Sequence, residues 1–270
     1  MDRRRFLAAL GASTTVGIAG CSDGGTDRPF ADAEWRDGDG LALDVLAESH
    51  VEALVEAGGV TLFSTAETSH DGDAEPSPWL PSQEYESGYD LENGRWYVRQ
   101  ERTESDETDV AELYVADDEM LFRQRLGDET QYDRRSTDDG SADDLEESMR
   151  GEVATGIRVE AETAGGEAEY EGLNLWSPTS DGEGEVRGEP SARFTADAFD
   201  GDRSVPESIE TASATVHVFE SGVVPRLEQS WEGEHGGQTA TVDVDIDYRD
   251  LGAEIPVPDW VDAARDATST

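Results

Sequence analysis

The chain has 270 residues and carries 64 acidic against 20 basic side chains, a formal net charge of −44. With no basic stripe to neutralise phosphates, this composition excludes nucleic acid as an expected partner. Every basic residue is arginine and there is a single cysteine, so no disulfide can form within one chain. An acid excess without lysine resembles halophilic archaeal proteins, which fold in molar salt that screens charges beyond about 3 Å. The alternative is a disordered acidic chain, but aromatic residues spread along the sequence favour a folded domain.

The first 20 residues have the composition of an export signal peptide. Arg3 and Arg4 stand before Phe6 and Leu7, a pattern that resembles a twin-arginine signal and implies export after folding. The uncharged stretch 6–19 is too short to span a membrane, because its helix would rise about 21 Å against a hydrocarbon core of about 30 Å.

The signal ends in Ile18-Ala19-Gly20-Cys21, which resembles a lipoprotein box. That resemblance implies cleavage before Cys21 and a diacylglycerol-type lipid on its thiol, since only a thiolate is nucleophilic enough to form the thioether. The alternative is an uncleaved helix with an incidental cysteine. We expect a protein held at the extracellular face of the cell membrane by its lipid, with residues 21–40 as a flexible acidic tether.

A helix is expected over residues 41–57, where Leu46, His50 and Leu54 recur at helical spacing before a Gly58-Gly59 stop. Strands are expected over 60–68, 85–90 and 95–102, the last two joined by an Asn-Gly hairpin turn. A second hairpin joins 111–115 to 120–126, and a short helix is expected over 142–153. Residues 161–190 are rich in glycine and glutamate, which indicates long loops around one strand, "YEGLNLW".

The last third of the chain is expected to form consecutive strands. "SATVHVFESG" and "VVPRLEQSW" predict a hairpin about Ser221-Gly222, and "QTATVDVDIDY" alternates apolar and polar residues with period two. Residues 263–270 are a frayed tail or a short helix. The order of elements predicts an α+β domain over residues 41–262, a large curved antiparallel sheet (a half-barrel) with helices packed on one face.

No motif in the sequence indicates a chemical reaction. The sequence contains no H-E-x-x-H, G-x-S-x-G, P-loop or G-x-G-x-x-G, so we expect neither catalysis nor a cofactor. Asp243, Asp245 and Asp247 could bind calcium, but carboxylates on one strand face lie about 6.8 Å apart, and a solvated face is the simpler interpretation; no metal is expected. His50 is interpreted as a hydrogen-bonded core histidine rather than as a base or ligand.

Aromatic and apolar side chains on the expected strands and first helix have two interpretations. They are ordinary core, or they line an apolar cavity between sheet and helices that receives an acyl or isoprenoid chain. The cavity candidates are Leu46, His50, Leu54, Trp96, Phe122, Trp176, Phe219 and Trp231.

Two resemblances bear on function. The signal and Cys21, together with "SHVEALVEAGGVT" and "DIDYRDLGAEIPVPDW", resemble an uncharacterised group of haloarchaeal twin-arginine lipoproteins. More distantly, a helix followed by consecutive hairpins resembles the LolA/LppX-like carriers of lipoproteins and lipids, whose curved half-barrel encloses an apolar cavity. The resemblance implies a membrane-anchored lipoprotein that binds an apolar ligand; a structural or interaction lipoprotein without a cavity, and an enzyme, are the alternatives.

Overall fold

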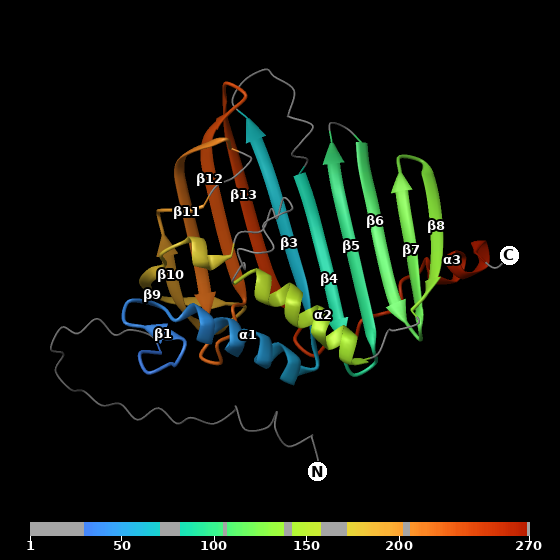
Figure 1. Ribbon diagram of the computed structural model, residues 1–270, viewed down its shortest axis with the longest axis horizontal. Helices are drawn as coiled ribbons and strands as arrows, with labels where there is room; N and C mark the ends of the chain where they lie inside the picture. The colour runs from blue at the N-terminus through green and yellow to red at the C-terminus, as the bar shows by residue number, and fades with distance from the viewer. Residues whose placement is uncertain are drawn as a thin grey trace, which may run out of the picture.

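One antiparallel sheet of eleven strands dominates the computed structural model, which describes residues 30–70, 82–104, 107–137, 142–157, 172–201 and 206–268 (Figure 1). The sheet is built from two meanders. The first contains β3 (Gly59–His70), β4 (Ser82–Asp90), β5 (Arg95–Glu104), β6 (Glu107–Ala116), β7 (Glu119–Leu126) and β8 (Glu129–Ser136). The second contains β9 (Thr179–Val186), β10 (Glu189–Ala196), β11 (Ser208–Val218), β12 (Arg226–His235) and β13 (Gln238–Arg249). They join where β13 pairs with β3, which leaves β8 and β9 as the two ends of an open sheet.

The helices lie on both sides of this sheet. On one face, here called the front, α1 (Leu43–Ala57) and α2 (Ala142–Thr155) pack together, and the hydroxyl of Tyr248 on β13 donates to the Val153 carbonyl of α2. On the back, α3 (Val261–Ala267) packs against Tyr114 and Leu121, which are paired in register on β6 and β7. The predicted α+β class with a large curved antiparallel sheet is confirmed, but helices pack on both faces rather than on one, because α3 covers a second apolar cluster on the back.

α1 ends where its sequence indicates and begins at Leu43, two residues later than expected. Its buried residues Leu46, His50 and Leu54 form one face. Gly58 ends the helix in the left-handed region (φ 87°), and its N–H bonds to the carbonyls of Leu54 and Val55. The next residue has no room for a side chain, because a Cβ on Gly59 would lie 2.0 Å from the Tyr89 carbonyl oxygen. Glycine at both positions therefore turns the chain directly from helix into β3.

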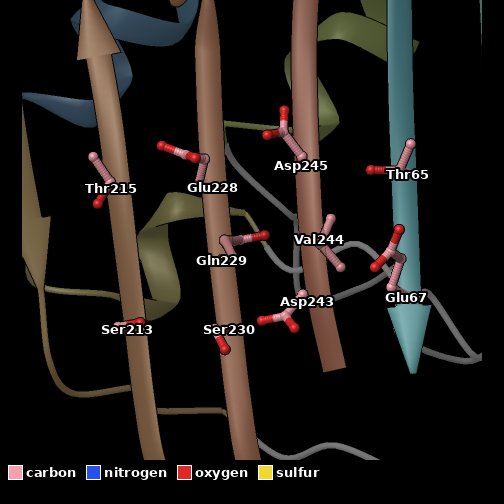
Figure 2. A pocket seen from close by; sticks show the side chains of 10 residues that line it. All are labelled: Thr65, Glu67, Ser213, Thr215, Glu228, Gln229, Ser230, Asp243, Val244 and Asp245. Atoms are coloured by element: carbon pink, nitrogen blue, oxygen red, sulfur yellow. The ribbon is translucent and has the colours of Figure 1, made fainter. Parts of the chain in front are cut away.

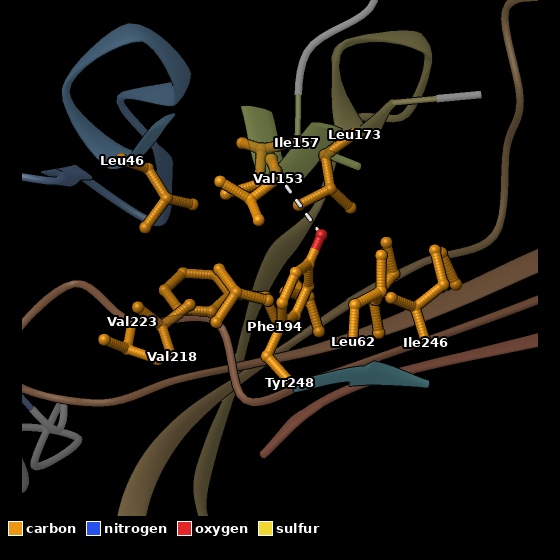
Figure 3. Close-up of a cluster of buried hydrophobic side chains, with 14 of the residues drawn as sticks. Leu46, Leu62, Val153, Ile157, Leu173, Phe194, Val218, Val223, Ile246 and Tyr248 are labelled. Carbon is orange, nitrogen blue, oxygen red and sulfur yellow. Dashed lines mark hydrogen bonds between the residues drawn. The ribbon is translucent and has the colours of Figure 1, made fainter. Parts of the chain in front are cut away.

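The front face of β3, β4 and β10–β13 is covered by α1, α2 and the short 3₁₀ helix η2 (Leu173–Leu175), which together enclose the main core. Figure 3 shows Leu46, Val153, Ile157 and Leu173 from this layer facing Phe194, Val218, Leu62 and Ile246 of the sheet. A second, smaller cluster lies under α3.

Three local expectations differ from the structure. Within the described part of 161–190, β9 and the start of β10 stand where loops were expected, and Leu173–Leu175 of the expected strand form η2 instead. β8 was not expected, because exposed side chains on both of its faces leave no periodic pattern. Residues 30–40, placed in the tether, pack on the domain: Trp35 is 3% exposed and its indole N–H donates to the Glu220 carbonyl.

Candidate functional site

The eight cavity candidates do not form one group. Leu46, His50 and Leu54 are buried on the inner face of α1. Trp176 contacts the Phe199 ring in a tilted arrangement and Trp231 contacts it edge to face, with 5.0 and 5.7 Å between ring centres. These residues and Phe219 belong to the main core, where side chains fill the space between sheet and helices. Trp96 packs at the margin of this core, while Phe122 lies outside it. Whether any of the eight contacts a ligand stays a prediction.

His50 is a fully buried, neutral histidine. Its Nδ1 accepts the Val224 N–H at 3.2 Å, which places the ring proton on Nε2, and the ring meets Tyr248 edge to face at 4.6 Å. Nε2 has no hydrogen-bond partner in the described part of the chain. Burial lowers the pKa of His50 from 6.5 to about 3, because the charged form would lose its hydration without gaining a partner.

Acid is therefore expected to destabilise the protein through His50. The unfolded chain takes up a proton below pH 6.5 while the folded chain stays neutral until about pH 3, so stability is complete above 6.5 and falls with pH between these values. Between pH 7.5 and 5.0 this contributes a loss of about 2 kcal/mol. Urea unfolding of the wild type, His50→Asn and His50→Leu at both pH values measures this loss. Each variant should lose about 2 kcal/mol less unfolding free energy than the wild type on acidification, although His50→Leu also leaves the Val224 N–H unpaired. Equal losses in all three chains would contradict the prediction.

Six apolar side chains on the front of β5, β6 and β7 lie outside the two core clusters, except that Trp96 packs at the margin of the main core. Their register places them in two rows across three strands, with Trp96, Val115 and Met120 in one row and Val98, Leu113 and Phe122 in the other. All six are partly exposed, and in Figure 1 α2 reaches only the lower end of β5, while neither α1 nor α2 crosses β6 or β7. We call these six residues the open apolar face. The guanidinium of Arg135 on β8 lies over the Phe122 ring at 5.0 Å and marks its outer rim.

A hydrogen-bonded carboxylate borders the open apolar face on its inner side. Glu152 of α2 accepts from the hydroxyls of Tyr85 (2.7 Å), Ser87 (3.0 Å) and Tyr89, all on β4. Ser87 in turn accepts the Trp96 indole N–H at 3.2 Å, and Trp96 stacks on Tyr89. Burial and the Glu152 charge raise the pKa of Tyr89, so its hydroxyl remains a donor. This Glu152 cluster (Tyr85, Ser87, Tyr89, Glu152) fixes α2 at the margin of the open apolar face.

The back of the sheet carries an acidic groove of about 360 Å³ (Figure 2). Glu67, Glu228, Asp243 and Asp245 line it from three neighbouring strands, and Arg226 binds Asp245 at 2.5 Å. Asp247, the third aspartate of this strand face, binds Arg187. Within the described residues, no group of three or more acidic, histidine or cysteine side chains could hold a metal ion.

Sequence reasoning missed Glu152, Val98, Leu113, Val115 and Met120. A signal for the last four was present, because "WYV", "LYVA" and "MLF" are apolar at consecutive positions, which indicates strands with an apolar side chain on both faces. Glu152 had no local signal, since its partners lie 63 to 67 residues away in the chain. The export and lipidation candidates Arg3, Arg4, Phe6, Leu7 and Cys21 lie outside the described residues. No helix in the described part of the chain is long and apolar enough to cross a membrane.

The described residues thus form an α+β fold with an open antiparallel sheet; among them, helices cover the front of one half of the sheet and none covers the front of β6 and β7. No protein-family model and no curated protein matches the sequence. The solved structures that it resembles include a LolA superfamily protein from Nitrosomonas europaea, with 11% identity, a TM-score of 0.22, and coverage of 81% of this chain and 96% of that chain. A MucA/MucB complex from Pseudomonas aeruginosa has 12% identity, a TM-score of 0.22, and coverage of 78% and 59%. The ywiB protein from Bacillus subtilis has 11% identity, a TM-score of 0.17, and coverage of 72% and 93%.

Proposed function

We propose that the protein is a membrane-anchored extracytoplasmic lipoprotein that binds the hydrocarbon chain of a lipid-like ligand on the open apolar face. The observation that carries this proposal is the contrast between the two halves of the front face. α1 and α2 cover the apolar side chains of β3, β4 and β10–β13, whereas the six of β5–β7 stay partly exposed. Partly exposed apolar side chains that are grouped on one face, rather than scattered singly, favour a binding surface there.

The dimensions of the open apolar face favour a hydrocarbon chain. Three adjacent strands span about 10 Å, and two alternate positions along each strand span about 7 Å. This footprint is far smaller than the roughly 800 Å² that each partner buries in a stable protein complex. Contact with about seven methylene groups would contribute about 6 kcal/mol before the entropic costs of binding, which supports a weak and reversible association.

A second candidate is an interaction lipoprotein whose open apolar face is the centre of a larger contact with a partner protein. This candidate is favoured because, in the described residues, only β8 borders the open apolar face on its outer side, so no element encloses a ligand there. A partner protein would have to contact polar residues around the six as well.

Two measurements test the proposal. Native mass spectrometry of the full chain, purified from its own membranes in molar salt, should show a bound lipid. Titration with a fluorescent acyl probe should then show that Phe122→Gln weakens binding about tenfold, because an aromatic ring is lost from the contact.

Phe63→Gln is the matched control for that variant. Phe63 is also partly exposed and also lies under an arginine, Arg249 at 4.5 Å, but it is on the back of β3. Its substitution should leave the affinity for the acyl probe within twofold of the wild type. Absence of co-purified lipid, together with equal probe affinities for the two variants, would reject lipid binding at this face and favour the protein partner.

A further inference from the structure

The two ends of the open sheet differ in how they are protected. At one end, Ser180 of β9 donates its N–H to the Asp39 carbonyl at 2.7 Å, from the loop between β1 (Arg36–Asp37) and β2 (Gly40–Leu41). β9 also carries Asp181, Glu183 and Glu185, so it would repel a second copy of itself. At the other end, β8 is the last strand in the described sheet, and all of its side chains except Tyr132 are exposed. A free edge of this kind is a template for a further strand.

We propose that β8 pairs antiparallel with β8 of a second copy of this chain, about a two-fold axis at Tyr132. The sequence "ETQYDRRS" is self-complementary in this register. Glu129 of each copy lies opposite Arg135 of the other, Gln131 lies opposite Asp133, and the two Tyr132 rings meet on the axis. Every charged side chain thus faces an opposite charge or a neutral partner, and opposite charges at directly paired positions stabilise a sheet.

Neighbouring registers are unfavourable. Side chains alternate between the two faces of a strand, and a two-fold axis perpendicular to the sheet keeps each face on the same side in both copies. The residue that lies opposite a given residue can therefore change only by two positions at a time. One such shift sets Glu129 opposite Asp133 twice, and the shift in the other direction sets Asp133 opposite itself. Like charges directly opposite each other destabilise a strand pair, so the charges of β8 select the register centred on Tyr132.

The pairing also affects the helix on the back of the sheet. In Figure 1, α3 reaches past β8 on the back of the sheet, and Tyr132 of that strand packs against the cluster under α3. The two-fold axis at Tyr132 therefore brings the α3 helices of the two copies close together on the back of the paired strands. It also keeps both fronts on one side, so the two open apolar faces lie on the same surface of a continuous sheet, separated by the two β8 strands.

Sedimentation of the full chain carrying Cys21→Ser, at 5 to 200 µM in molar salt, tests the association. We expect a reversible monomer–dimer equilibrium. Glu129→Arg sets arginine opposite arginine twice and should weaken the dimer at least about tenfold, whereas adding Arg135→Glu to it exchanges the charges and should restore the dimer. Arg125→Glu, exposed on neighbouring β7, should have no effect. A monomer at every concentration, or a dimer that ignores these charges, overturns the proposal.

Oxidative cross-linking tests the register. In the same Cys21→Ser background, Tyr132→Cys places two thiols across the axis, within reach of a disulfide. Thr130→Cys is the matched control, because residue 130 lies opposite 134, and its own mate is about 13 Å away along the strand. We expect a covalent dimer from position 132 alone. Equal cross-linking from both positions, or from neither while the dimer is present by sedimentation, overturns the register.

Discussion

Replacing Cys21 with serine is expected to move the protein from the membrane to the soluble fraction. The proposed anchor is a diacylglycerol-type lipid on the Cys21 thiol, and each buried methylene group contributes about 0.8 kcal/mol to membrane affinity. Two acyl chains therefore hold the protein durably, whereas a serine hydroxyl is too weak a nucleophile to accept them. Membrane sedimentation in molar salt, followed by mass spectrometry of the N-terminal peptide, measures both location and processing.

Two further variants separate anchoring from export. Ser22→Ala, next to the modified residue, should stay anchored and lipidated. The pair Arg3→Lys and Arg4→Lys keeps both positive charges but removes the paired arginines, so it should leave the protein inside the cell and unprocessed. If Cys21→Ser is processed and pelleted to the same extent as the wild type, the lipid anchor is wrong.

The elements that could be predicted from the sequence are those with one buried and one exposed face. α1 carries Leu46, His50 and Leu54 at helical spacing and then Gly58, and β13 alternates between core residues and aspartates, so each element shows its period directly. β8 shows no period, because nearly all its side chains are exposed, and β9 alternates exposed positions with serine and glycine rather than with apolar side chains, so neither strand has a clear apolar face. The physical cause of their formation is a neighbouring strand, which a single segment does not reveal.

The candidate site was only partly predictable for the same reason. Trp96 and Phe122 could be selected one by one as large side chains on strands, but their grouping with Met120 and Leu113 depends on the pairing of three strands. The Glu152 cluster depends on a still longer connection, the return of α2 across β4 after four intervening strands. Nothing in the sequence distinguishes Glu152, a single structural carboxylate, from the other acidic residues among the 64.

Glu152→Ala is expected to lower the free energy of unfolding by about 3–4 kcal/mol, measured by urea titration in molar salt. A hydrogen bond to a charged acceptor contributes about 1.5–3 kcal/mol when taken singly. This carboxylate accepts three, from Tyr85, Ser87 and Tyr89, and because the three share one acceptor their contributions are less than additive. Ser87 and Tyr89 are almost fully buried, so their hydroxyls lose an acceptor that water cannot easily replace. Glu152→Gln keeps one acceptor oxygen and should lose about half as much.

Glu147→Ala provides the matched control, because Glu147 is an exposed glutamate on the same helix and the change in charge and helix composition is identical. It should change stability by no more than about 0.5 kcal/mol. A double-mutant cycle between Glu152→Ala and Tyr85→Phe should give a coupling energy of about 1–2 kcal/mol, since both changes remove the same hydrogen bond. Equal urea midpoints for Glu152→Ala and Glu147→Ala would show that α2 is held by its apolar contacts through Met149 and Val153 alone. The cluster's stabilising effect at the margin of the open apolar face would then be absent.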